Sequence, residues 1–65
     1  MTLSDFLKDW RRRGNLTQTE AARALGLPLK TYQAVEQGRP FKHEQLVRLA
    51  VVTLIEEQRQ IEVVA

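Results

Sequence analysis

The strongest constraint on the fold of this 65-residue chain is a pair of short helical segments joined by a tight turn. Thr17 and Glu20 have the spacing of a capping box, in which each side chain binds the other residue's backbone N–H at a helix start. Gly26 stands where such a helix ends in a left-handed residue, and Pro28 suits the first position of a following helix. We therefore expect one helix over residues 18–25 and a second from residue 28 or 29 to residue 37.

Further helices are expected on both sides of this pair. Apolar residues recur every three or four positions between residues 2 and 13, which predicts an amphipathic helix ended by Gly14 and Asn15. Residues 46–55, LVRLAVVTLI, are apolar on nearly every side of a helix expected over residues 42–60. The last five residues, IEVVA, suit a helix end, a strand or disorder. The sequence predicts an all-α fold: one domain over residues 1–65 with a helix-turn-helix core at 17–38.

Charge is unevenly distributed along the chain, although the net charge is only +2. Residues 1–43 carry eight basic and four acidic side chains, whereas residues 44–65 carry two basic and four acidic ones. A basic first part suits contact with a polyanion such as nucleic acid. Chance is the alternative explanation, because the number of charges is small.

The composition also argues against several classes of function. The chain has no cysteine, which excludes disulfides, and its single histidine, His43, cannot build a metal site alone. No carboxylate pair or glycine-rich phosphate loop points to catalysis. No apolar run approaches the roughly 18–20 residues that span a bilayer. We expect no enzyme activity, metal, cofactor or membrane segment, and a cytoplasmic protein.

The segment LTQTEAARALGLPLKTYQAVEQGR, residues 16–39, resembles the helix-turn-helix of Cro/repressor-type (XRE-like) transcription regulators of phages and bacteria. The resemblance covers about residues 6–55 and implies a lambda-repressor-like domain of four to five helices that binds DNA. The stretch is also similar to small phage autoregulators, including anti-CRISPR-associated repressors. The matching residues are Leu16, Gln18, Glu20, Ala22, Leu25, Gly26, Leu27, Tyr32, Val35, Glu36 and Gly38.

The resemblance implies roles for individual side chains. Lys30 and Gln33 fall at or beside base-contacting positions, where Lys30 suits guanine and Gln33 suits adenine, with a phosphate contact as the alternative for each. Gln18 falls where the family binds a backbone phosphate and braces the recognition helix. The implied DNA-binding set is Gln18, Leu29, Lys30, Thr31, Gln33, Ala34, Arg39 and Lys42.

Arg11 and Glu36 occupy the positions of a family ion pair that fixes the presentation of the recognition helix; an ordinary surface carboxylate is the alternative for Glu36. Two residues depart from the family pattern. Pro28 stands where a capping Ser or Thr is usual, and Leu29 replaces a polar first base-contacting residue. Since leucine cannot hydrogen-bond a base edge, Leu29 is limited to a thymine methyl group or a sugar.

The last expected helix has more apolar surface than one small domain can cover, which favours a second copy as its partner. We expect a homodimer that binds a palindromic operator in double-stranded DNA as a repressor, with recognition helices roughly 34 Å apart and no small-molecule effector. The alternative is a protein-interaction module, such as an antitoxin or anti-regulator, that does not bind specific DNA. The predicted dimer interface is Val47, Val51, Leu54, Ile55 and Ile61.

Overall fold

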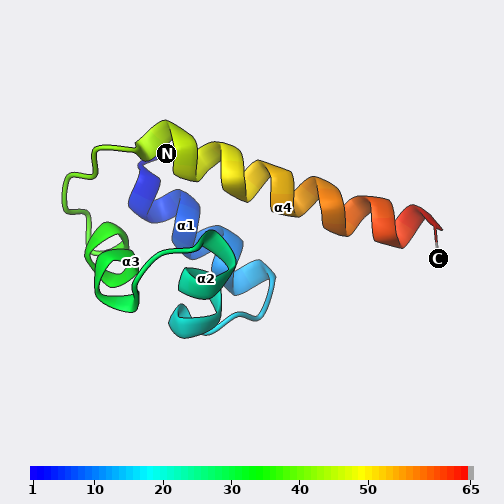
Figure 1. Cartoon of the computed structure of the whole chain (residues 1–65), viewed down its shortest axis with the longest axis horizontal. Coiled ribbons are helices and arrows are strands. Elements are labelled where there is room, and N and C mark those ends of the chain that lie inside the picture. Colours follow the sequence, from blue (N-terminus) through cyan, green and yellow to red (C-terminus); the bar gives the residue numbers. More distant parts are fainter. Residues whose placement is uncertain (65) are drawn as a thin grey trace.

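Four helices make up the described part of the chain (Figure 1). The structure, a computed structural model, describes the backbone of residues 1–64 and the side chains of residues 1–57. No strand occurs among residues 1–64, so the expected all-α fold is confirmed. The helices are α1 (Leu3–Arg13), α2 (Gln18–Leu25), α3 (Leu29–Glu36) and α4 (Glu44–Val64).

The capping signals act where the sequence predicted them. The Thr17 hydroxyl accepts from the Glu20 N–H at 3.1 Å, and the Glu20 carboxylate accepts from the Thr17 N–H at 2.9 Å, which completes the capping box of α2. Gly26 ends α2 in the left-handed region, at φ 71°. The next N–H, from Leu27, donates to the Ala22 carbonyl at 2.9 Å, and this closes the turn onto the helix.

Helix α1 ends at Arg13 and α3 begins at Leu29, both within the expected limits, but three details of the helix ends refine the expectation. Pro28 is the residue before α3, with ψ 145°, rather than its first helical residue; its carbonyl accepts from the Tyr32 N–H at 3.0 Å. Asn15, at φ 56°, takes the left-handed conformation after α1, whereas Gly14 does not. Helix α4 begins at Glu44, two residues late, and continues through Val64, so IEVVA is helical except for Ala65, which lies outside the described residues.

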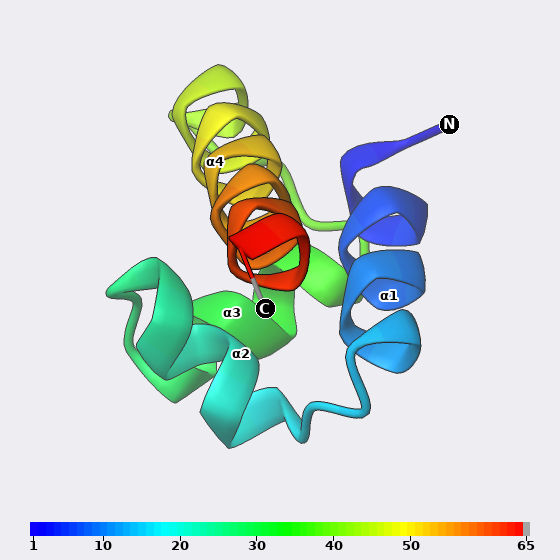
Figure 2. The same ribbon diagram turned by 90° about the vertical axis from the view of Figure 1, so that its right-hand side faces the viewer.

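The four helices meet around a small core. Figure 2 looks nearly along α4 and shows α1 to the right and the α2–α3 pair below it. Leu7, Tyr32 and Val51 are the largest fully buried side chains, so α1, α3 and α4 each supply one of them. Beyond this core, α4 runs on past the other three helices (Figure 1). The buried apolar residues are Leu3, Leu7, Ala21, Ala22, Tyr32, Val35, Val47 and Val51.

The predicted dimer interface on α4 needs a correction. Val47 and Val51 are 6% and 0% exposed, because the first half of α4 lays this side on the core of its own chain, and they are therefore unavailable to a partner. Leu54 is half-buried, Ile55 is 39% exposed, and the side chain of Ile61 lies outside the described residues. Among the residues of α4 up to Glu57, the apolar ones with the largest exposure are instead Leu46 and Leu49.

Candidate nucleic-acid interface

Helix α3 presents one side to solvent. It buries Tyr32, Val35 and Glu36, which share one side of a helix by their spacing of three and four. Lys30 therefore lies near the middle of the opposite side, where it is exposed, and Ala34 beside it is half-buried. Most of the side chains predicted to contact bases thus lie on or beside the solvent-facing side of α3.

Leu29 lies at the edge of this side and is 39% exposed. It is the first residue of α3, and Pro28 before it provides no side-chain cap. The first backbone N–H groups of α3 have no partner within the helix, and the side chain of residue 28 accepts no hydrogen bond from them. An apolar, partly exposed residue therefore occupies a helix start where polar side chains are usual.

The far side of α3 is tied to α1 by an ion pair between Arg11 and Glu36. Arg11 Nε lies 2.7 Å from Glu36 Oε2, and Nη2 donates to Oε1 at 3.3 Å. Arg11 Nη1 also donates to the Leu16 carbonyl at 3.3 Å. The pair is two-pronged, and it holds the end of α3 and the α1–α2 connection to one helix.

The Glu36 carboxylate is charged despite its burial. The Glu36 side chain is 3% exposed and that of Arg11 is 19% exposed. Burial alone would raise the pKa of Glu36, but hydrogen bonds led by that of Arg11 outweigh burial and hold it below its usual 4.5. The same hydrogen bond raises the pKa of Arg11. Both groups are therefore ionised at neutral pH.

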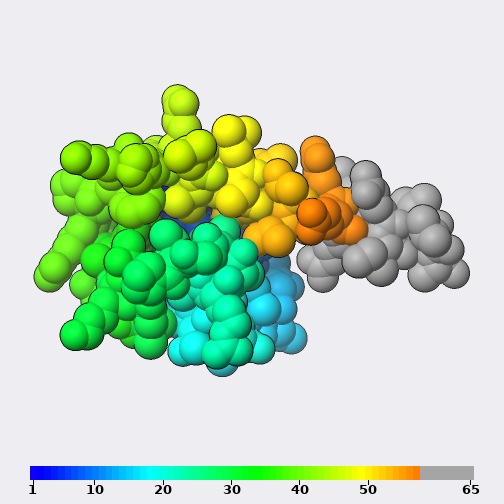
Figure 3. Space-filling model, in the orientation of Figure 1, coloured from blue at the N-terminus to red at the C-terminus, as the bar shows by residue number. Residues whose placement is uncertain are grey.

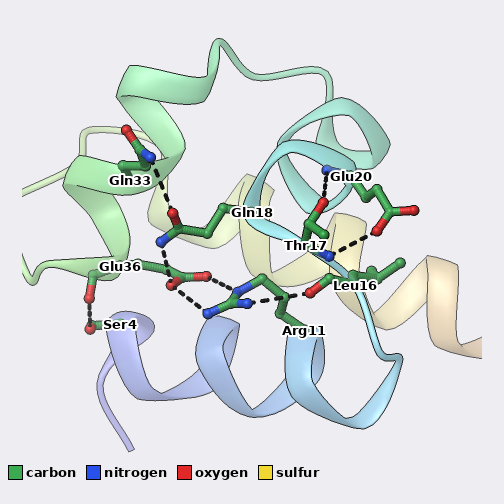
Figure 4. Close-up of polar contacts among 8 residues, drawn as sticks. All are labelled: Ser4, Arg11, Leu16, Thr17, Gln18, Glu20, Gln33 and Glu36. Carbon is green, nitrogen blue, oxygen red and sulfur yellow. Dashed lines mark hydrogen bonds and ion pairs between the residues drawn. The ribbon is translucent and has the colours of Figure 1, made fainter.

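Gln18, the first residue of α2, joins this ion pair to the exposed part of α3 (Figure 4). Gln18 Nε2 donates to Glu36 Oε1 at 3.2 Å, and Gln18 Oε1 accepts from Gln33 Nε2 at 3.1 Å. The bracing role expected of Gln18 is thus visible in its contacts. Gln33, expected to be free for a base, already has one amide contact within the chain.

Sequence reasoning missed two features of the region around Glu36. The Ser4 hydroxyl donates to the Glu36 backbone carbonyl, which adds a second tie between α1 and α3 (Figure 4). The Tyr32 hydroxyl is buried and has no hydrogen-bond partner among the described residues. Burial raises the pKa of Tyr32, and the nearby Glu36 carboxylate raises it further, so Tyr32 stays neutral. No pattern in the sequence marks Ser4, which stands 32 positions from Glu36.

Cationic side chains lie on the exposed side of α3 and in the segment that follows it. Lys30, Arg39 and Lys42 are exposed, and none forms an ion pair with a side chain of residues 1–57. Figure 3 shows the side chains of α3 and of the segment after it gathered at one end of the molecule. Thr31 in the same region is half-buried. This end of the molecule therefore carries positive charge beside a helix that hydrogen bonds tie to α1 and α2.

Other kinds of site are not seen in the described part of the chain. Within it, no group of three His, Cys, Asp or Glu side chains is placed to hold a metal ion. None of the helices described combines the length and apolar character needed to cross a membrane.

A comparison with models of protein families identifies a match. The model of a family described as "Helix-turn-helix domain" matches residues 2–58. The match includes all of α1, α2 and α3 and the larger part of α4. No curated protein and no solved structure matches the chain significantly.

Proposed function

The chain belongs to this helix-turn-helix domain family, and we propose that it is a sequence-specific DNA-binding transcription regulator whose α3 enters the major groove. One observation carries the proposal. The exposed side of α3 has the cation Lys30, which pairs with no carboxylate of residues 1–57, while its opposite side is fixed to α1 and α2 through Glu36. A recognition helix needs both properties, because base contacts are made only if the helix is held at a defined angle.

Each exposed side chain of the interface then has a role that its chemistry allows. Lys30 donates to guanine O6 and N7, Gln33 contacts adenine, and Leu29 and Ala34 touch thymine methyl groups. Gln18 stands in the first turn of α2, where the helix dipole and free N–H groups favour a phosphate. Phosphate contacts are assigned to Gln18, Thr31, Arg39 and Lys42.

The regulator acts as a homodimer on an inverted repeat, as a repressor that blocks the promoter by occupancy. The support is an apolar face of α4, defined by Leu46, Leu49 and Val52, which are 64%, 63% and 43% exposed. Contiguous exposed apolar residues mark interaction sites on small proteins. A second copy is the occupant we favour, because α4 extends past α1, α2 and α3 (Figure 1) and a two-fold axis pairs two recognition helices.

Selection from random DNA with the purified chain tests the function directly. We expect an enriched inverted repeat whose half-site centres are about one helical turn apart, roughly 34 Å, and affinity that falls steeply with salt. No enriched sequence at any salt concentration would refute sequence-specific binding and leave the protein-interaction module as the better explanation of the α4 face. A single unpaired half-site would refute the dimer alone.

Two substitutions separate base contacts from phosphate contacts. Lys30→Ala should change the preferred sequence at one position of each half-site. Arg39→Ala should weaken all sequences alike and reduce the salt slope by about 1, because one phosphate contact is lost. Indistinguishable effects of the two variants on every sequence would contradict this division.

Sedimentation without DNA tests the interface on α4. Leu49→Glu should convert the dimer to a monomer without unfolding it, since Leu49 is 63% exposed in the single chain. Gln37→Glu adds the same charge at an exposed residue next to α3 and should leave the dimer intact. Equal masses for Leu49→Glu and the parent chain would refute this face.

A further inference from the structure

The Gln18 side chain makes two hydrogen bonds of opposite sense (Figure 4). Its Nε2 donates to Glu36 Oε1 at 3.2 Å, and its Oε1 accepts from Gln33 Nε2 at 3.1 Å. An amide has a donor end and an acceptor end, and the hydrogen-bond network determines which end lies where. The two contacts of Gln18 are compatible with one orientation of its amide.

That orientation is imposed from inside the protein. The Glu36 carboxylate is 3% exposed and paired with Arg11 at 2.7 Å, so it only accepts hydrogen bonds. If Gln18 turned over, its oxygen would face the carboxylate and its NH₂ group would face the Gln33 NH₂ group. Both contacts would become repulsive, and mismatched polar groups cost more free energy in a partly buried site than in water. Gln18 must therefore donate towards Glu36 and accept from Gln33.

The consequence reaches Gln33 on α3. One N–H of Gln33 is committed to Gln18. Its Oε1 and its second N–H have no partner among residues 1–57, so they are available to another molecule. A glutamine without such a constraint can present either end to a base. Gln33 is half-buried next to the exposed side of α3, so its free edge is close to the surface assigned to DNA.

We propose that Glu36, acting through Gln18, sets the hydrogen-bond polarity of Gln33 and makes it selective for adenine over guanine. This inference rests on the proposed DNA-binding function. Adenine offers an N6 donor and an N7 acceptor, which match the free Oε1 and the free N–H of Gln33. Guanine offers acceptors at both O6 and N7, so the Gln33 oxygen would face an oxygen or a nitrogen lone pair. Glu36 and Gln18 are positioning residues that touch no base.

The first test needs no DNA. In the free protein, NMR should find that the side-chain NH₂ protons of Gln33 exchange with water more slowly than those of Gln45, an exposed glutamine of α4. Gln18→Met keeps the chain length of residue 18 but removes both hydrogen bonds, and it should abolish the protection at Gln33. Fast exchange at Gln33 in the parent chain would overturn the proposed polarity.

The second test measures base preference. The base pair contacted by Gln33 is identified as the one whose preference Gln33→Ala removes, and operators carrying all four bases there are then compared in competition. The parent chain should prefer adenine to guanine by about 5- to 150-fold, the range for a good bidentate contact. In Gln18→Met this ratio should shrink to about threefold or less, because the Gln33 amide is then free to turn.

The control variant is Gln45→Met, the same chemical change on α4, which should keep the ratio of the parent chain. Uniform weakening by Gln18→Met with an unchanged ratio would overturn the inference while the DNA-binding function stands, since only a phosphate contact would have been lost. Absence of sequence-specific binding by the parent chain would overturn the function itself. The proton-exchange result then still decides whether the polarity of Gln33 is set from within.

Discussion

Arg11→Met should destabilise the protein more than Glu36→Met, although both substitutions break the same ion pair. The reason is the charge that each leaves behind. Arg11→Met leaves a carboxylate that is 3% exposed, with Gln18 as its remaining amide donor. Glu36→Met leaves a guanidinium that is 19% exposed and still bound to the Leu16 carbonyl at 3.3 Å.

The expected magnitudes follow from this difference in burial. Loss of one partner from a buried pair costs about 3–5 kcal/mol, and the Gln18 contact places Arg11→Met near the lower end, at about 3 kcal/mol. For Glu36→Met we expect a loss of about 1–2 kcal/mol in the free energy of unfolding. This is the cost of the lost hydrogen bonds, because the Arg11 guanidinium that remains is still partly hydrated. The total free energy of unfolding of a domain of this size is about 3–10 kcal/mol. Each kcal/mol lost lowers its Tm by about 4–8 °C, so Arg11→Met should lower Tm by about 12–24 °C.

The assay is urea unfolding of both variants and of the double variant, followed by circular dichroism at pH 7. The double variant should be within about 2 kcal/mol of the parent chain, because no buried charge remains. Arg13→Met is the control: its pair with Asp9 is 80% and 45% exposed, and its loss should cost about 0.5 kcal/mol or less. Equal costs for Arg11→Met and Glu36→Met, or strictly additive costs in the double variant, would refute the reasoning.

Three further predictions concern pH, the turn and the first residue of α3. The pKa of Glu36 lies below its usual 4.5, so its contribution to stability should be complete above about pH 5 and be lost as pH falls through the lowered pKa. When the free energy of unfolding is measured against pH in acid, it should therefore change less in Glu36→Gln than in the parent chain. Gly26→Ala should lower the free energy of unfolding in urea by about 1–2 kcal/mol. The cost comes from the positive φ of residue 26 alone, since no atom lies within 4 Å of the added Cβ; Gly14→Ala, at φ −87°, should cost less. Replacing the one thymine of each half-site that Leu29 contacts by uracil should weaken operator binding, and this effect should vanish in Leu29→Ala.

Signals that act over a few residues were sufficient to predict the helix-turn-helix. Thr17, Glu20 and Gly26 define both ends of α2 because each contacts backbone within four positions. The Gln18–Gln33 contact spans 15 positions and joins two ordinary polar residues, so neither periodicity nor capping could indicate it. The Arg11–Glu36 pair, 25 positions apart, could be predicted only from the resemblance to a family that contains it.

Helix α4 shows why the sequence of a long apolar helix does not determine which of its sides faces the core. Periodicity identified the helix, but the side it buries depends on how α1, α2 and α3 meet it. The core takes Val47 and Val51, whereas the larger Leu46 and Leu49 remain 64% and 63% exposed. Complete burial of a leucine is worth about 1.5–3 kcal/mol, so a single domain that leaves two leucines in water forgoes several kcal/mol. The proposed dimer recovers part of this free energy, and the exposed leucines thus favour association over a monomer.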